Sequence, residues 1–200
     1  MKNFYLKIVK EISELNFEIG SSGNVSFLNG GNLLITPTGK TFADGLLIDK
    51  NSNDIKPSSD VDAHSAIYSA RKDIVAIYHT HSHYSALASQ LSSDIPVFST
   101  MHADYFGEPI KLVKFSNHRQ TGFGQIKQFS SGSAFLLEKH GGLLFFSQLN
   151  MNKILNIIIS FEEICRLYCD LSMMGSSKIV KINNRDAKIM HDYYHSKYGQ

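Results

Sequence analysis

An apolar run that ends in regularly spaced histidines places the strongest constraint on the fold of this 200-residue chain. The run, IVAIYHTHSHYSAL, covers residues 74–87 and contains His79, His81 and His83. Side chains two residues apart in an extended strand share a face, so His79 and His81 are expected to face a common target. The SHYSALASQL pattern predicts a helix from Ser82, which would turn His83 away. We therefore expect a buried strand that ends at a site and is followed directly by a helix.

The composition predicts one globular domain with a hydrophobic core, spanning residues 1–200. Hydrophobic residues make up 42% and charged residues 19% of the chain, and the formal net charge of +2 comes without a long basic run. This balance disfavours nucleic acid as a partner. The longest apolar stretch, ILNIIISF, is followed at once by Glu162 and Glu163, so no membrane-spanning segment is expected.

The N-terminal segment and the cysteines predict a cytoplasmic protein. MKNFYLKIVKEISEL mixes Lys and Glu into an apolar periodicity, which indicates an amphipathic helix rather than a signal peptide. Cys165 and Cys169 lie four residues apart in a helical pattern, where a disulfide is not expected and a reduced setting fits. As zinc ligands they would need further partners, so we predict that they are buried helix residues.

The remaining periodicities predict a single α/β domain without repeats or linkers. Strand-like segments at residues 24–28 and 32–36 flank Gly30 and Gly31, which predicts a hairpin. The other expected elements are helices at residues 3–17, 61–71, 82–91, 150–174 and 185–198, a strand at 73–81, and a strand pair at 134–146 broken at 140–142. Hairpins favour an antiparallel sheet, whereas the strand–helix alternation near residues 55–100 favours a parallel one, and periodicity alone does not decide between them.

The imidazoles could serve a catalytic metal. His79 and His81 with a distant third histidine would supply three nitrogen ligands and leave a tetrahedral cation one open position for substrate. His140 also ends an apolar strand, and Gly141 and Gly142 after it would let the backbone turn tightly around a site. The alternative is a set of partly buried histidines held by hydrogen bonds, which a bare His-x-His pair favours but His140 disfavours.

Five short motifs follow one another along the chain: SSGNVSF at 21–27, ITPTG at 35–39, KPSSD at 56–60, HTHS at 79–82 and KHGG at 139–142. In this order and spacing the chain resembles the class II aldolase/adducin family over nearly its whole length. The resemblance implies an α/β domain with a central, mainly antiparallel β-sheet flanked by helices. It also implies a zinc site formed by His79, His81 and His140, although another divalent metal would suit the same ligands.

The resemblance further implies a binding site for a substrate phosphate. Backbone N–H groups and hydroxyls in Gly-rich loops and at helix N-termini bind phosphate, although each such segment taken alone is commonly a turn or a cap. The positions that the family uses correspond here to Asn24, Thr38, Gly39, Ser58 and Ser59. One difference is Thr36, which stands where the epimerases of the family have lysine and the aldolases have threonine.

Two reactions of the family share a first step, in which zinc stabilises the enediolate formed when a carbon–carbon bond of a ketose phosphate breaks. An aldolase then releases the aldehyde. An epimerase retains it, lets it turn and re-forms the bond on its other face. The epimerase therefore requires a proton-transfer group for each orientation of the alkoxide.

Three features favour the epimerase. Asp60 stands where the aldolases have glutamate and the epimerases have aspartate, although an aspartate after two serines could equally be a helix cap. Asp104 lies in MHADYFG, which matches an epimerase segment implicated in proton transfer; without the resemblance it would be a solvated residue in a loop or helix start. Tyr198, in the terminal YGQ, corresponds to a tyrosine that acts in a neighbouring subunit's site, with His191 or His195 upstream of it.

The leading hypothesis is a zinc-dependent epimerase that interconverts L-ribulose 5-phosphate and D-xylulose 5-phosphate, or a similar pentulose phosphate, by retro-aldol cleavage and re-addition. Alternatives are a class II aldolase cleaving a ketose 1-phosphate such as L-fuculose 1-phosphate, a related dehydratase, and a non-catalytic adducin-like assembly module. The family implies a homotetramer with active sites between subunits, while the sequence itself requires only an oligomer, because Tyr198 would act in trans. The stretch from Lys114 to Ser133 is shorter than in the epimerases.

Overall fold

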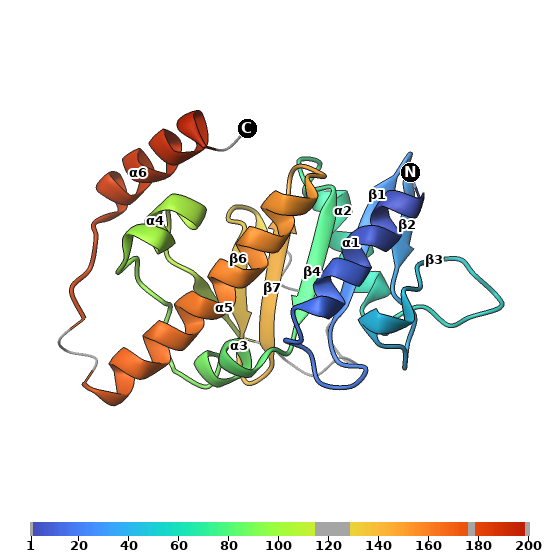
Figure 1. The fold of residues 1–200 in the computed structure, drawn as a ribbon, viewed down its shortest axis with the longest axis horizontal. Coiled ribbons are helices and arrows are strands. Elements are labelled where there is room, and N and C mark those ends of the chain that lie inside the picture. Colours follow the sequence, from blue (N-terminus) through green and yellow to red (C-terminus); the bar gives the residue numbers. More distant parts are fainter. Residues whose placement is uncertain (1, 115–128, 176–178, 199–200) are drawn as a thin grey trace.

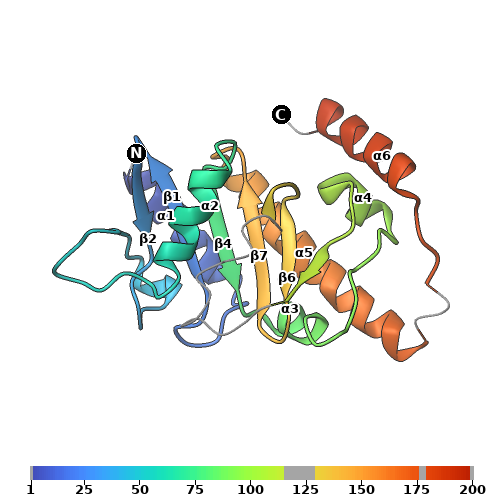
Figure 2. The same ribbon diagram turned by 180° about the vertical axis from the view of Figure 1, so that it is seen from behind.

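The computed structural model describes residues 2–114, 129–175 and 179–198 and shows an α/β fold built on one sheet (Figures 1 and 2). Its strands are β1 (Asn24–Asn29), β2 (Asn32–Ile35), β3 (Ile48–Asp49), β4 (Ala76–Thr80), β5 (Lys111–Val113), β6 (Ala134–Leu137) and β7 (Gly141–Phe146). They are ordered β3-β2-β1-β4-β7-β6-β5. Every pairing is antiparallel except that of β5 with β6, so the mainly antiparallel sheet is confirmed.

Helices cover both faces of this sheet. They are α1 (Lys2–Glu14), α2 (Val61–Ala70), α3 (His83–Ala88), α4 (Thr100–Phe106), α5 (Met151–Met173) and α6 (Asn184–Lys197), with a 3-10 turn η1 (Phe42–Asp44). Figure 1 shows α1 and α5 across the near face, and Figure 2 shows α2 across the opposite face. In both views α4 and α6 lie together beside the sheet, and α3 lies at its lower end.

The strands supply two hydrophobic cores because their side chains alternate between the two faces. In β4, Tyr78 belongs to the core that includes α1 and α5, whereas Ile77 belongs to the core that includes α2. Leu144 and Leu143 of β7 divide in the same way. His79 has the parity of Ile77, so its side chain lies on the α2 face of the sheet.

The two glycines after His140 do not form a turn, which corrects the expectation from the sequence. Gly141 and Gly142 are the first residues of β7, and the turn precedes them. A Cβ atom on Gly141 would lie 2.1 Å from the carbonyl oxygen of Thr80, and one on Gly142 would lie 2.5 Å from Cε1 of Phe161. The glycines are therefore required for the close packing of β7 against β4 and α5.

The MHADYFG segment forms most of a helix rather than a loop. Ser99 caps the start of α4, because its side chain accepts a hydrogen bond from the N–H of His102 at 3.1 Å. Gly107 ends the helix with a φ of 64°, a left-handed conformation that favours glycine. Of the two expectations, a loop or a helix start, the structure shows the helix, and Asp104 is half-buried in it rather than solvated.

Cys165 and Cys169 are free and buried in α5, as expected, and burial raises the pKa of both thiols. Across the described ranges, no helix is long and apolar enough to cross a membrane. The cytoplasmic location and the domain limits stay predictions. Most of the stretch between Lys114 and Ser133 lies outside the described residues, as do the last two residues of the terminal YGQ motif.

Replacing Gly142 by alanine should lower the free energy of unfolding by about 1–3 kcal/mol, because the added methyl group would overlap the buried ring of Phe161. Urea unfolding of the metal-free protein measures this loss. In a double variant that also carries Phe161→Leu, the smaller side chain relieves part of this overlap. The double variant should therefore lose less free energy of unfolding than the two single variants together. Additive losses would show that this contact is not the constraint on position 142.

Candidate active site

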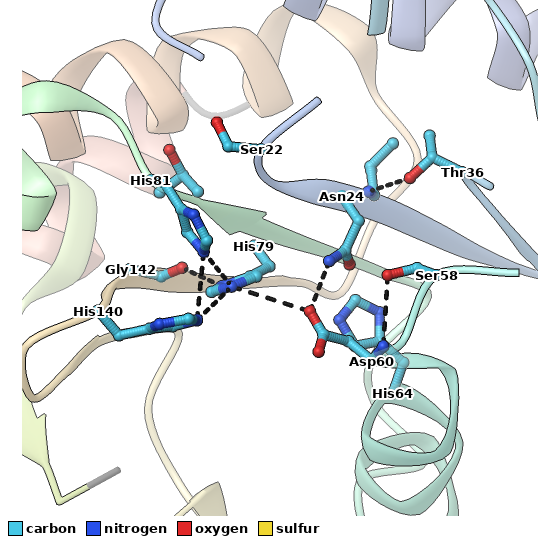
Figure 3. A network of polar contacts seen from close by, with 12 residues as sticks. Ser22, Asn24, Thr36, Ser58, Asp60, His64, His79, His81, His140 and Gly142 are labelled. Atoms are coloured by element: carbon cyan, nitrogen blue, oxygen red, sulfur yellow. Dashed lines mark hydrogen bonds and ion pairs between the residues drawn. The ribbon is translucent and has the colours of Figure 1, made fainter. Parts of the chain in front are cut away.

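Three histidine side chains converge at one end of the sheet (Figure 3). His79 lies near the end of β4, His81 lies just beyond it, and His140 ends the turn between β6 and β7. Their Nε2 atoms are 2.9 Å apart for His79 and His81, 3.1 Å for His79 and His140, and 3.2 Å for His81 and His140. His83 begins α3 and is not part of this triad, as expected.

Hydrogen bonds among the three rings do not account for this arrangement. Each Nε2 atom carries either a proton or a lone pair, so among three mutually close Nε2 atoms at least two are of the same kind. A cation that accepts three lone pairs removes the conflict. Three imidazoles that leave a fourth position open are the donor set of a catalytic divalent metal site, and the triad therefore fits zinc.

The carbonyl group of Gly142 selects the tautomer of His79. His79 Nδ1 lies 3.0 Å from this oxygen. Because a carbonyl oxygen only accepts, Nδ1 carries the proton and Nε2 carries the lone pair. This is the tautomer that a metal ligand requires, and the same hydrogen bond orients the ring.

Asp60 places a carboxylate beside the triad. Its Oδ2 accepts a hydrogen bond from Asn24 Nδ2 at 2.7 Å and lies 3.8 Å from His79 Nε2 (Figure 3). Asp60 is the residue before α2, but its side chain makes no capping hydrogen bond. The alternative of a plain helix cap is therefore wrong.

The three segments predicted to bind phosphate lie side by side. Thr36 joins the first two, because its Oγ1 accepts a hydrogen bond from the N–H of Val25 at 3.1 Å. Thr38 joins the second and third, because its N–H and hydroxyl donate to the carbonyl oxygens of Lys56 and Pro57 at 3.0 and 2.7 Å. These segments contain the five residues predicted from the resemblance, Asn24, Thr38, Gly39, Ser58 and Ser59. Their contact with phosphate stays a prediction.

Asn24 also offers an acceptor to a ligand. Its Oδ1 is buried and has no hydrogen-bond partner within the described parts of the chain, while its Nδ2 donates to Asp60. A buried acceptor without a donor costs about 1–3 kcal/mol. An ionised phosphate offers no proton, so this oxygen suits a substrate hydroxyl better than a phosphate oxygen.

Asp104 lies in α4, and Tyr198 directly follows α6. These two helices lie together beside the sheet, away from the end of β4 that carries His79 (Figures 1 and 2). The hydroxyl groups of Tyr105 and Tyr194 lie 3.3 Å apart between these helices. Tyr198 directly follows α6, where its ring centroid is 5.6 Å from that of Tyr194 and the residue is 70% exposed. One chain therefore does not bring these two residues to the triad.

The environment of Asp104 includes His191 and His195, the two histidines between which the sequence did not decide. Burial raises the pKa of the Asp104 carboxyl, and the nearby imidazoles of His191 and His195 oppose this rise. A Cβ atom on Gly107 would lie 2.8 Å from Cβ of His191, so α6 rests directly on the end of α4. Both histidines thus belong to the Asp104 group.

Sequence reasoning missed the buried residues behind Asp60. His64 lies four residues after Asp60, and its Nδ1 is 2.7 Å from Ser26 Oγ. Ser26 Oγ is also 2.9 Å from the hydroxyl of Tyr68, which donates to the Ser26 carbonyl at 3.0 Å. Because that carbonyl takes the Tyr68 proton, Ser26 donates to Tyr68 and His64 Nδ1 donates to Ser26. The helical spacing of four from Asp60 was the available signal.

His64 is consequently neutral, with its lone pair on Nε2. Burial lowers the pKa of His64 to about 3, although the nearby charge of Asp60 opposes this effect. Nε2 has no hydrogen-bond partner in the described structure. Figure 3 shows the ring next to the Asp60 carboxylate, so His64 forms part of the floor of the site.

Two carboxylates near the triad were also missed. Glu18 accepts a hydrogen bond from the backbone N–H of His81 at 3.0 Å. Glu162 accepts one from the N–H of Tyr84 at 2.8 Å, at the start of α3. No local pattern predicts either contact, since each joins residues that are far apart in the sequence.

Comparison with known protein families shows to which family the chain belongs. A family model described as "Class II Aldolase and Adducin N-terminal domain" matches residues 5–169. The chain belongs to this family, which confirms the resemblance seen in its motifs.

Individual relatives include both enzymes considered above. An L-fuculose phosphate aldolase of Methanocaldococcus jannaschii is 34% identical over 147 residues, which cover 70% of this chain and 81% of the relative. A probable L-ribulose-5-phosphate 4-epimerase of Mycoplasma pneumoniae is 24% identical over 205 residues, with coverages of 89% and 83%. The solved structure of an L-fuculose 1-phosphate aldolase matches with a TM-score of 0.80 at 24% identity, over 96% of this chain and 95% of that structure. At this identity the match supports the assignment of the fold and not of the reaction. The relatives are enzymes, so the prediction of an enzyme is confirmed.

His64 should make the free energy of unfolding depend on pH. The unfolded chain protonates this imidazole near its ordinary pKa of 6.5, but the folded protein does so only near 3, so the unfolded state binds more protons between these values. Stability should therefore fall as the pH decreases from 6.5 toward 3. The His64→Asn variant, whose amide can retain the hydrogen bond to Ser26, should show a shallower fall. Urea titrations of the metal-free proteins measure both slopes, and equal slopes would contradict the assignment.

Proposed function

We propose that the protein is a metal-dependent 4-epimerase of a pentulose 5-phosphate, interconverting L-ribulose 5-phosphate and D-xylulose 5-phosphate. The packing of α4 on α6 carries the proposal, because it brings Asp104 beside the helix that leads into Tyr198. Two proton-transfer groups that are distant in sequence thereby belong to one surface. An aldolase, which releases its aldehyde, has no need of a group for re-addition on the other face.

The triad and Asp60 form the first half of the proposed site. His79, His81 and His140 hold the cation, for which zinc is the best fit to three imidazole donors. When bound, this cation supplies the Lewis acid that polarises the ketose carbonyl. Asp60 is held by Asn24 and lies next to His79, so it is placed to exchange a proton with a hydroxyl of the substrate.

Asp104 and Tyr198 form the second half and act on the C4 hydroxyl. Cleavage of the C3–C4 bond requires loss of the proton from that hydroxyl, and re-addition on the other face requires its return from a different side. The raised pKa of Asp104 suits a carboxyl that both takes up and releases a proton. Tyr198 is exposed beyond the end of α6, where it is available to another subunit.

The separation of the two halves supports an assembly with shared active sites. In a single chain α4 and α6 lie away from the triad (Figures 1 and 2), so the proposed mechanism requires a neighbouring copy to supply Asp104 and Tyr198. We propose a homotetramer with one site at each interface between neighbours, the arrangement that the family implies. Each copy then gives one half-site and completes another.

A class II aldolase acting on a ketose 1-phosphate is the second candidate. The 34% identity to an L-fuculose phosphate aldolase favours it, since the identity to the probable epimerase is 24%. Thr36 also agrees with the aldolases. Both reactions use the triad, so the products distinguish them.

The decisive experiment is an NMR time course of the zinc-loaded protein with L-ribulose 5-phosphate. Appearance of D-xylulose 5-phosphate without free glycolaldehyde phosphate supports the epimerase. Cleavage of L-fuculose 1-phosphate, with no change in the pentulose phosphate, supports the aldolase instead. The absence of bound metal after zinc loading would overturn both candidates.

Asp104→Asn and Tyr198→Phe should each slow epimerisation by about 100-fold or more, because each removes a proton-transfer group. The zinc content should remain that of the parent, since neither residue belongs to the triad. Tyr193→Phe is a matched control, because Tyr193 is also exposed on α6. Its rate should stay close to that of the parent. Full activity of both main variants would rule out their proposed roles.

Two inactive variants should complement each other if the site is shared. His140→Ala removes the triad and leaves the second half intact, while Tyr198→Phe does the reverse. In mixed oligomers assembled from equal amounts, about a quarter of the interfaces combine two intact halves by chance. Co-expression with two different affinity tags, followed by the epimerase assay, measures the recovered activity. No recovery in verified mixed oligomers would place both halves in one subunit.

A further inference from the structure

The carboxylate of Glu18 accepts four hydrogen bonds at the edge of the candidate active site. Oε1 accepts from the hydroxyl of Tyr78 at 2.8 Å and from that of Thr80. Oε2 accepts from the hydroxyl of Ser22 at 3.1 Å and from the backbone N–H of His81 at 3.0 Å. A carboxylate offers about four lone-pair positions, so its accepting capacity is filled.

These donors come from two parts of the proposed site. Tyr78, Thr80 and His81 lie at the end of β4 and just beyond it, where the metal ligands are. Ser22 belongs to the loop that leads through Gly23 into Asn24. A single side chain thus joins the backbone of a proposed metal ligand to the loop that carries a proposed substrate contact.

Gly23 shows how closely the loop approaches this carboxylate. A Cβ atom at this position would lie 2.9 Å from both Cδ and Oε2 of Glu18 and 2.8 Å from the carbonyl oxygen of His79. The residue also has a φ of 70°, which favours glycine. The loop is therefore packed directly between Glu18 and the strand that carries the triad.

We propose that Glu18 is a positioning residue that sets both the metal ligand His81 and the Ser22–Asn24 loop. The inference rests on the proposed role of the triad and on the prediction that the loop leading into Asn24 binds phosphate. It assigns to Glu18 the positioning of the metal-binding and the substrate-binding parts of the site relative to each other. Loss of Glu18 then affects two binding events at once. Replacing a residue that only stabilised the fold would lower the thermal unfolding midpoint without specifically weakening metal binding and phosphate binding.

Glu162 provides a matched control for this proposal. Its carboxylate is also buried near the triad and accepts hydrogen bonds from the side chain of Ser82 and the backbone N–H groups of Tyr84 and Ser85. These partners lie at the start of α3, and none of them is the backbone of a metal ligand. Glu162→Gln therefore perturbs the fold at the same corner without releasing His81.

The experiment measures Co²⁺ and inorganic phosphate binding by the Glu18→Gln variant. The glutamine amide accepts at only one atom where the carboxylate accepts at two, so the variant cannot accept hydrogen bonds from all four donors of Glu18. We expect the dissociation constant for Co²⁺ to rise about 10-fold or more, the usual effect of losing a group that orients a metal ligand. The visible absorption spectrum of bound Co²⁺ should change, and phosphate should bind to the metal-loaded variant more weakly than to the parent. Glu162→Gln should also lower the thermal stability. It should nevertheless keep the parent Co²⁺ spectrum and bind Co²⁺ and phosphate with affinities within about twofold of the parent.

Tyr78→Phe supplies a second measurement in case Glu18→Gln does not fold. It removes one donor to Glu18 while keeping the buried ring, and it should weaken Co²⁺ binding about threefold. Parent-like Co²⁺ affinity and spectrum in the Glu18→Gln variant, or in Tyr78→Phe if that is the only folded one, would overturn the inference. Equal perturbation by Glu162→Gln would also overturn it, by showing a general structural effect. If the parent binds Co²⁺, these results leave the proposed function standing; if the parent binds none, the proposed function fails first.

Discussion

Backbone pairing on both edges of β4 is the constraint on which the rest of the site depends. His79 lies opposite Asn24 on β1 and opposite Leu143 on β7, and Thr80 lies opposite Gly142. The end of one central strand is thereby held in a fixed register with the start of the two strands beside it. The ladder fixes the Cα atom of His79 and brings the end of β4 next to the start of β7, so His81 and His140, which flank these strand ends, lie close to it. The carbonyl of Gly142 then selects the tautomer of His79.

The longer elements and the histidines of the triad could be predicted because their signals are local, whereas the short strands β3 and β5 were not predicted. An amphipathic period, an alternating strand and a His-x-His pair are visible within a few residues, and the position of His140 relative to two glycines pointed to the same site. The direction of the sheet was not visible in the periodicity and came only from the resemblance. Gly142 was assigned to a turn because a glycine looks the same in sequence whether it turns the chain or admits a neighbouring ring such as that of Phe161.

Residues whose role arises from distant contacts escaped prediction. Glu18 lies in a polar loop with no periodic pattern, and its partners Tyr78 and His81 come some sixty residues later in the chain. His64 resembles any polar residue in a helix until its neighbours Ser26 and Tyr68 are seen to be buried with it. Such residues support the ones that do chemistry, and tertiary structure alone brings them into view.

The two halves of the proposed site differ in how they are built into the molecule. The triad is attached to the middle of the sheet, whereas α6 packs on α4 through a small cluster that includes Ala103 and Ala187. The family match covers residues 5–169 and ends before α6 begins at Asn184. The proposed second half therefore draws on both parts of the chain, because Asp104 lies inside the matched region and Tyr198 lies beyond it. A chain cut before α6 would keep all three histidines of the triad and lose one of the two groups proposed for proton transfer, so cation binding and turnover are separable in this fold.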